Sequence, residues 1–168
     1  MNVILVDENN KEKGTIDKIE AHKKGKLHRA FSIFVFNDKN ELLLQKRADN
    51  KYHSSGKWSN TCCSHPLPGK DVEIEAGRRL KEEMGFNCEL ENKFEFIYLA
   101  ELENKMIEHE YDFIFFGTYN KDPDPDPKEV SDWKWISLEK LKKEMLESPE
   151  KYTPWLRIIM QKFIFSQL

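Results

Sequence analysis

The sequence predicts an α+β protein that folds as one domain over residues 1–168, with several strands and three helices. Three observations support this prediction. A chain of 168 residues can bury about two thirds of its unfolded surface around one core. Its hydrophobic content of 39% is that of a folded globule, and its charged content of 34% fits a solvated surface. Segments typical of strands and of helices follow one another along the chain without internal repeats.

Strand signals dominate the first part of the chain. The segment Val3–Asp7 predicts a first strand, and Asn9–Lys11 predicts a turn after it. Further on, Ala30–Phe36 and Leu42–Arg47 are rich in aromatic, β-branched and leucine residues, and the polar segment Asn37–Asn40 separates them. This arrangement predicts a β-hairpin.

The clearest helix is predicted from Asp71 to Met84. Asp71 is a suitable N-cap, and Gly85 follows at the position where a glycine commonly ends a helix. The polar side carries Arg79 and Glu83, which form either a surface ion pair or part of an anion site. Apolar residues recur every fourth position and predict one buried face: Val72, Ala76, Leu80 and Met84.

Two further strands are predicted at Phe94–Leu99 and Met106–Tyr119. The second strand changes from alternating to continuously apolar at Phe113–Phe116, which indicates one exposed end and one buried end. The following segment, Asp122–Pro127, alternates aspartate with proline and therefore lacks backbone donors for a helix or a central strand. It is predicted to be an extended loop that serves as a stiff connector.

The C-terminal part of the chain is predicted to contain a short strand and two helices. The strand is Trp133–Ile136, and Ser137 is the expected N-cap of the helix that follows it. The last helix is expected to have Thr153 as its N-cap and Pro154 as its first residue.

Net charge and cysteine content exclude several classes of protein. With 27 basic and 30 acidic residues the chain has a net charge of -3, so it lacks the basic field of nucleic-acid-binding and membrane-surface proteins. The apolar run Val3–Val6 is too short for a signal-peptide core, and no apolar stretch is long enough to span a membrane. Three cysteines cannot form a paired framework and suggest reduced thiols. We expect a cytoplasmic protein with no evident protein partner.

Several residues offer ligand atoms for a metal ion. Glu108 and Glu110 stand two apart on a predicted strand, so both carboxylates point to one side while His109 points to the other. Taken singly, such carboxylates and histidines are more often solvated or hydrogen-bonded, and the spacing alone does not decide. The other candidates are His22, His28, Cys63 and His65.

The segment Cys62–His65 allows two interpretations. It resembles half of a zinc site, although no second Cys or His pair follows at the spacing of a structural zinc site. Alternatively, a cysteine close to a histidine is the arrangement of a nucleophile with its general base. The sequence leaves the choice open.

The segment Arg78–Phe86 resembles the second half of the Nudix signature, in which a helix carries metal-binding glutamates. Counting along that signature, Ser64 replaces the first glycine, and Lys70 and Arg79 replace two glutamates. The carboxylate set that a diphosphate hydrolase uses is thereby reduced to Glu82 and Glu83.

Four more segments make the resemblance specific. The segments are Leu27–Ser32, Ser59–Pro66, Glu108–Asp112 and Tyr152–Trp155, which are spread over nearly the whole chain. They resemble, in the same order, segments of the type I isopentenyl diphosphate isomerases, a family with a Nudix fold in which helices flank a mixed β-sheet.

The resemblance implies two divalent metal ions. The first, which ligand type alone allows to be Zn²⁺, Mn²⁺ or Mg²⁺, would be held by three histidines and two glutamates. The second, Mg²⁺, would bridge the substrate diphosphate to Glu83. The ligands of the first ion would be His22, His28, His65, Glu108 and Glu110.

The resemblance also implies how the substrate is held and converted. Cys63 and Glu110 would transfer protons on opposite faces of isopentenyl diphosphate, with Tyr98 assisting Glu110. Trp155 would face the carbocation that forms between the two transfers. The diphosphate would contact four basic side chains: Lys18, Arg47, Lys51 and Arg79.

Two other functions remain open at this point. A Nudix hydrolase is disfavoured by Lys70 and Arg79, because hydrolysis needs a carboxylate cluster that holds metal ions. A non-catalytic Nudix module that binds a diphosphate would not need Cys63 and Glu110 together.

Overall fold

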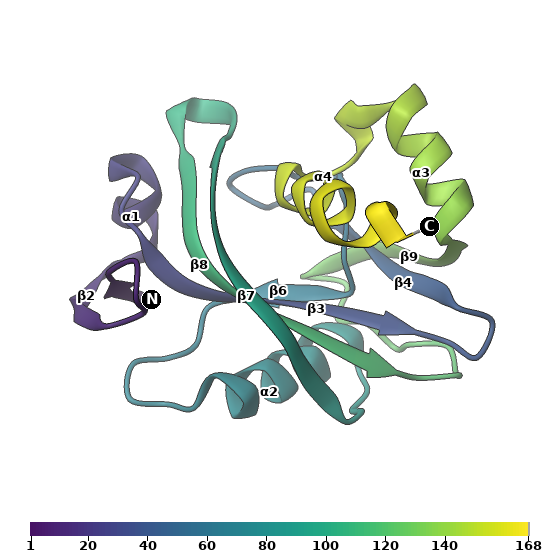
Figure 1. Ribbon diagram of the computed structural model, residues 1–168, viewed down its shortest axis with the longest axis horizontal. Coiled ribbons are helices and arrows are strands. Elements are labelled where there is room, and N and C mark those ends of the chain that lie inside the picture. Colours follow the sequence, from purple (N-terminus) through teal and green to yellow (C-terminus); the bar gives the residue numbers. More distant parts are fainter. Residues whose placement is uncertain (168) are drawn as a thin grey trace.

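The computed structural model describes residues 1–167. A twisted mixed sheet forms its centre, with α2 below it and the C-terminal helices above it in Figure 1. The strands are β1 (Asn2–Val6), β2 (Glu12–Asp17), β3 (His28–Phe36), β4 (Glu41–Arg47), β5 (Trp58–Ser59), β6 (Cys62–Ser64), β7 (Leu90–Glu101), β8 (Ile107–Thr118) and β9 (Val130–Ser137). The α-helices are α1 (Lys18–Lys24), α2 (Val72–Met84), α3 (Leu138–Glu147) and α4 (Pro154–Ile159).

Short helical turns complete the structure. They are η1 (Glu103–Lys105), η2 (Pro149–Lys151), the π-helical turn η3 (Met160–Ile164) and η4 (Phe165–Gln167). None of the helices in the described range is long and apolar enough to cross a membrane.

Strand β3 organises the sheet because it pairs with β1, β4, β6 and β8. Its pairing with β8 is parallel and continuous, from His28 opposite Glu110 to Phe36 opposite Thr118. The predicted turn between β3 and β4 is present, but Phe36 and Leu42 are the only directly paired residues. From there the two strands diverge: β3 pairs with β6 at Phe31–Ile33, whereas β4 pairs with β9 along its whole length.

The long antiparallel hairpin of β7 and β8 curves away from the sheet and passes beside α1 (Figure 1). Glu108 and Glu110 lie on β8 and are buried, whereas His109 points the other way and its Nδ1 lies 3.0 Å from the carbonyl oxygen of Gly25. The alternation predicted for this strand is therefore observed.

Helix α2 begins and ends as predicted. The carboxylate of Asp71 accepts hydrogen bonds from the backbone N–H groups of Glu73 and Ile74. Gly85 adopts a left-handed conformation with φ of 79° and ends the helix. Ala76, Leu80 and Met84 face the sheet and are fully buried.

The prediction of three helices was incomplete, because the sequence interpretation missed α1 and the strand β2 before it. Helix α1 has only seven residues, too few for a periodic apolar pattern. The side chain of Asp17 caps its start and Gly25 ends it with φ of 61°. Thr153 does stand at the N-cap of α4, but its hydroxyl contacts the hydroxyl of Ser59 at 3.3 Å and does not cap the helix.

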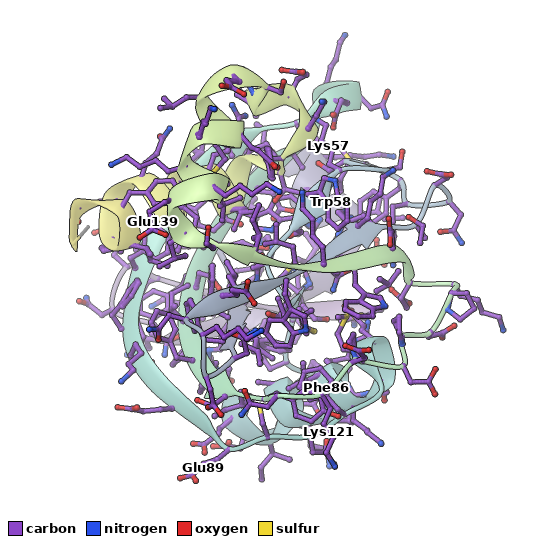
Figure 2. All side chains as sticks on the ribbon, turned by 90° about the vertical axis from the view of Figure 1, so that its right-hand side faces the viewer. Lys57, Trp58, Phe86, Glu89, Lys121 and Glu139 are labelled. Atoms are coloured by element: carbon purple, nitrogen blue, oxygen red, sulfur yellow. The ribbon has the colours of Figure 1, made fainter. Side chains whose placement is uncertain are left out.

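The core has a layer on each face of the sheet. One layer packs α2 against residues such as Phe31, Leu43 and Phe115. The other packs the C-terminal helices against residues such as Phe34 and Leu44. Figure 2 shows Phe86 beside α2 and Trp58 on the opposite side, near the C-terminal helices.

The aspartate-proline loop is irregular, as predicted, but it is bonded to α2. The backbone N–H of Asp124 donates to the carbonyl oxygen of Met84 at 3.1 Å, and that of Asp126 donates to the carbonyl oxygen of Glu83 at 3.0 Å. A Cβ atom on Gly85 would lie only 2.1 Å from the carbonyl oxygen of Asp124. The absence of a side chain at residue 85 thus allows the loop to dock on the helix.

Gly85→Ala should therefore destabilise the protein by more than about 1 kcal/mol, through backbone strain and the clash with Asp124. A matched control is Gly77→Ala in the middle of α2, where a Cβ meets nothing within 4 Å. That change should stabilise the helix by about 0.5–1 kcal/mol. Thermal melting of both variants measures the difference; equal melting temperatures would contradict the docking role of Gly85.

Candidate functional site

A cavity of about 350 Å³ opens between the diverging strands, α1, α2 and the start of α4. All of the site residues predicted from the sequence line it except His22 and His28, which lie behind its wall. Residues far apart in the sequence therefore meet at one place. The cavity has the size expected for a small ligand.

The five predicted metal ligands form one cluster beside this cavity. Their ligand atoms all lie within 4.8 Å of one another, and all five residues are buried. They come from four separate elements of the chain. The cluster consists of His22 from α1, His28 from β3, His65 just after β6, and Glu108 and Glu110 from β8.

Backbone carbonyl groups fix the orientation of two of the imidazole rings. Nδ1 of His22 lies 2.6 Å from the carbonyl oxygen of Lys18, and Nδ1 of His28 lies 2.7 Å from that of Lys26. A carbonyl oxygen can only accept, so each Nδ1 carries a hydrogen, and the neutral ring in this tautomer presents the lone pair of Nε2 to the cluster. Backbone groups that direct imidazole nitrogens in this way are typical of metal-binding histidines.

The inward-facing atoms are closely spaced. Nε2 of His28 lies 3.2 Å from Nε2 of His65. Nε2 of His65 lies 2.9 Å from Oε1 of Glu110, and Nε2 of His22 lies 3.2 Å from Oε2 of Glu108. Lone pairs and carboxylate oxygens thus converge on one small volume, which is the arrangement that a cation stabilises.

Burial dominates the electrostatics of the cluster. It lowers the pKa of His65 to about 4 and also lowers the pKa of His22, so both rings are neutral at pH 7. Burial, aided by the charge of Glu110, raises the pKa of Glu108. Burial also opposes ionisation of Glu110, but its close contacts with the imidazoles of His28 and His65 hold its pKa below the usual range. Three imidazole nitrogens and two carboxylates fit a divalent metal ion, which would favour ionisation of both glutamates.

The predicted proton-transfer residues line the same cavity. Tyr98 donates a hydrogen bond from its hydroxyl to Oε2 of Glu110 at 2.7 Å. Burial raises the pKa of Cys63 to about 12, so its thiol is protonated at pH 7. The side chains of Cys62 and Cys63 point to opposite sides of β6, as expected for extended backbone: Cys62 packs with the α2 core and Cys63 faces the cavity.

The four predicted phosphate-binding residues also lie around the cavity. Burial lowers the pKa of Lys18, and the nearby charges of Lys51 and Arg47 lower it further. The guanidinium of Arg47 donates to the carbonyl oxygens of His53 and Ser54, each at 3.2 Å. Positive charges held this close together favour a bound anion, because an anion relieves their repulsion.

Arg79 provides a second indication of an anion site. Its Nη2 donates to Oε1 of Glu83 at 2.6 Å and its Nη1 to Oε2 of Glu82 at 2.7 Å. Its Nε, in contrast, is buried and has no hydrogen-bond partner among residues 1–167. A buried donor left unpaired costs about 1–3 kcal/mol, which an anion oxygen at this position would recover.

Trp155 is fixed in the wall of the cavity. Its side chain is only 3% exposed, and its Nε1 donates to the hydroxyl of Ser59 at 3.0 Å. The guanidinium carbon of Arg47 lies 5.2 Å from the centre of the ring. The ring therefore has both a fixed orientation and an adjacent positive charge, the geometry of a cation-π contact.

The sequence interpretation missed four residues of this site: Gln45, His53, Ser59 and Glu129. Gln45 is a polar residue two positions after the buried Leu43, on the same side of β4, and this break in the apolar pattern was a usable signal. The imidazole Nε2 of His53 lies 3.4 Å from Oε1 of Glu108. The carboxylate of Glu129 pairs with Lys51 and lies 3.9 Å from Nη2 of Arg79. No local sequence pattern marks His53 or Glu129 as a site residue.

Known proteins are similar to this chain in both sequence and fold. The family model of the NUDIX domain matches residues 26–156. Isopentenyl-diphosphate Delta-isomerase 1 of Aromatoleum aromaticum is 52% identical over 162 residues, which cover 96% of this chain and 92% of that protein. Isopentenyl-diphosphate Delta-isomerase 2 of Photorhabdus laumondii is 48% identical over 166 residues, which cover 99% and 94%.

A solved structure of low sequence similarity supports the fold alone. DR0079 from Deinococcus radiodurans matches with a TM-score of 0.79 at 14% identity, covering 97% of this chain and 99% of that one. The mixed sheet flanked by helices predicted from the resemblance is thus confirmed as a Nudix fold. By the extent and identity of its match to these relatives, the chain belongs to the isopentenyl-diphosphate Delta-isomerase family of Nudix proteins.

Proposed function

We propose that this chain converts isopentenyl diphosphate to dimethylallyl diphosphate in isoprenoid biosynthesis. The observation that carries the proposal is one cavity lined by a protonated thiol, Cys63, and by a carboxylate, Glu110, with a basic anion site beside them. The relatives of the chain bear the name of this activity.

The reaction moves a double bond without changing the composition of the substrate. One group adds a proton to the terminal CH₂ carbon, which leaves a tertiary carbocation at the branched carbon. A second group removes a proton from the carbon on the other side of that cation, and the double bond forms there. Because an alkene is a very weak base, the proton donor must be fixed against the substrate in a site that excludes water.

In the proposed mechanism Cys63 and Glu110 carry the two protons. Tyr98 holds the carboxylate of Glu110 through its hydrogen bond of 2.7 Å. Trp155 faces the carbocation, and cation-π attraction in a dry site contributes about 2 kcal/mol or more. Lys18, Arg47, Lys51 and Arg79 bind the diphosphate, a role that the unpaired Nε of Arg79 supports.

We propose that the cluster of three histidines and two glutamates holds Zn²⁺, Mn²⁺ or Mg²⁺, and that Glu83 binds Mg²⁺ together with the diphosphate. When bound, the first ion would orient Glu110 and tune its acidity. We also propose a cytoplasmic location, which the three free cysteines support.

Incubation with isopentenyl diphosphate and Mg²⁺ in deuterated water tests the proposed reaction. NMR of the carbon skeleton should show dimethylallyl diphosphate that carries solvent deuterium, because one of its protons comes from an exchangeable group. Release of inorganic phosphate or diphosphate would instead indicate a hydrolase, and binding without any conversion would indicate a non-catalytic module.

The adjacent thiols provide a matched pair of variants. Cys63→Ala should lower turnover on the order of 10²- to 10⁴-fold, since it removes a positioned proton-transfer group, while the protein still binds diphosphate. Cys62→Ala should keep turnover near that of the wild type at saturating Mg²⁺, because this thiol is buried on the other side of β6, where it packs with the α2 core and contacts Glu83. Steady-state rates at equal metal content check both expectations. A dead Cys62→Ala with an active Cys63→Ala would overturn the assignment.

A further inference from the structure

The carboxylate of Glu83 is held by donors on both of its oxygens. Oε1 accepts from Arg79 at 2.6 Å on the cavity side. Oε2 accepts from the side-chain amide of Gln45 at 3.0 Å and from the thiol of Cys62 at 3.4 Å. Glu83 is 5% exposed, so these partners replace the water that an exposed carboxylate would bind.

The amide of Gln45 has no freedom to turn away from Glu83. Its Nε2 also donates to the carbonyl oxygen of Thr61 at 2.8 Å, and both acceptors lack hydrogens, so the nitrogen must be the atom that faces them. Thr61 is fixed in turn, since its hydroxyl donates to the carbonyl oxygen of Leu43 at 2.7 Å and accepts from the backbone N–H of Val35 at 2.9 Å. Both amide hydrogens of Gln45 are therefore used.

This arrangement makes the two oxygens of Glu83 unequal. Oε2 is tied to the interior by Gln45 and Cys62, whereas Oε1 accepts, within residues 1–167, a hydrogen bond from Arg79 alone, a side chain that lines the cavity. If Arg79 turned to a bound anion, Oε1 would remain directed toward the cavity because Oε2 is fixed. A carboxylate held in this way loses less rotational freedom on binding a cation.

We infer that Gln45, assisted by Cys62, is a positioning residue that directs Glu83 toward a divalent cation shared with the substrate diphosphate. The inference rests on the proposed function, which supplies the metal-diphosphate ligand. Partners of this kind, one step removed from the metal, typically change metal affinity or activity about 10- to 100-fold when they are removed.

Gln45→Met tests this role with little change in shape. Methionine matches glutamine in length, lacks both donors, and suits a site where the amide of Gln45 already lies 4.0 Å from the sulfur of Met84. The control is Gln161→Met, the same replacement at an exposed position. Each protein is first loaded with Zn²⁺, which has no electron paramagnetic resonance signal. It is then titrated with Mn²⁺ in the presence of inorganic pyrophosphate, and the free Mn²⁺ is measured by electron paramagnetic resonance.

Gln45→Met should bind Mn²⁺ with pyrophosphate about 10- to 100-fold more weakly than the wild type and the control. In the isomerase assay the Mg²⁺ concentration for half-maximal rate should rise by a similar factor, with kcat near wild type once Mg²⁺ is saturating. A purely structural role of Gln45 would lower stability without moving the Mg²⁺ dependence. Unchanged Mn²⁺ affinity in folded Gln45→Met would overturn the inference and leave the proposed function intact.

A second pair of variants tests the other donor to the carboxylate of Glu83, the thiol of Cys62. Cys62→Ala removes the thiol and should weaken Mn²⁺ binding. Cys62→Ser keeps a hydrogen-bond donor, so its Mn²⁺ affinity should stay within about threefold of the wild type, a smaller change than loss of a metal-supporting partner causes. Equal affinities for the alanine and serine variants would count against the contribution of Cys62. Absence of Mn²⁺-pyrophosphate binding by the wild type would overturn the metal-diphosphate assignment itself, and the role of Gln45 with it.

Discussion

The burial of two carboxylates side by side on β8 is the constraint on which the rest of the site depends. Glu108 and Glu110 are 4% and 6% exposed, and ionised groups at such positions are strongly unfavourable without close partners. The partners are three imidazoles from three other elements. The parallel pairing of β3 with β8 sets His28 directly opposite Glu110, and the two caps of the short helix α1 hold His22 in place. The register of β3 with β8 and the capping of α1 thus both position residues of this one cluster.

The cavity next to this cluster has two chemically different parts. One part suits a hydrocarbon and a transient cation, because it is lined by the thiol of Cys63 and the aromatic rings of Tyr98 and Trp155. The other part is positively charged and suits an anion, because it is lined by Arg47 and Arg79. Glu83 lies among the basic residues, where we propose that it binds Mg²⁺ together with the diphosphate. The departures from the Nudix signature fit this division, because Arg79 contributes a cation where a hydrolase would have a metal-binding carboxylate. Lys70, the other departure, is exposed and lies outside the cavity lining.

Local features of the structure could be predicted from the sequence, and contacts across the fold could not. The limits of α2 follow from Asp71 and Gly85, whose side chain and backbone act on neighbouring residues. The alternation of Glu108, His109 and Glu110 is likewise a property of any strand. Helix α1 escaped prediction because its stability depends on caps and on the burial of His22. The contact between Gln45 and Glu83 spans 38 positions in the chain, so only the assembled sheet and helix reveal it.

The proposed metal site can be tested directly. X-ray absorption at the zinc edge, on protein loaded with one equivalent of Zn²⁺, reports the ligand atoms of the ion and their distances. A site built from three imidazoles and two carboxylates predicts a shell of nitrogen and oxygen at about 2.0–2.2 Å with no sulfur. A sulfur shell at about 2.3 Å would show that a cysteine binds the ion. That result would contradict both the metal cluster and the role of Cys63 as a free thiol in the cavity.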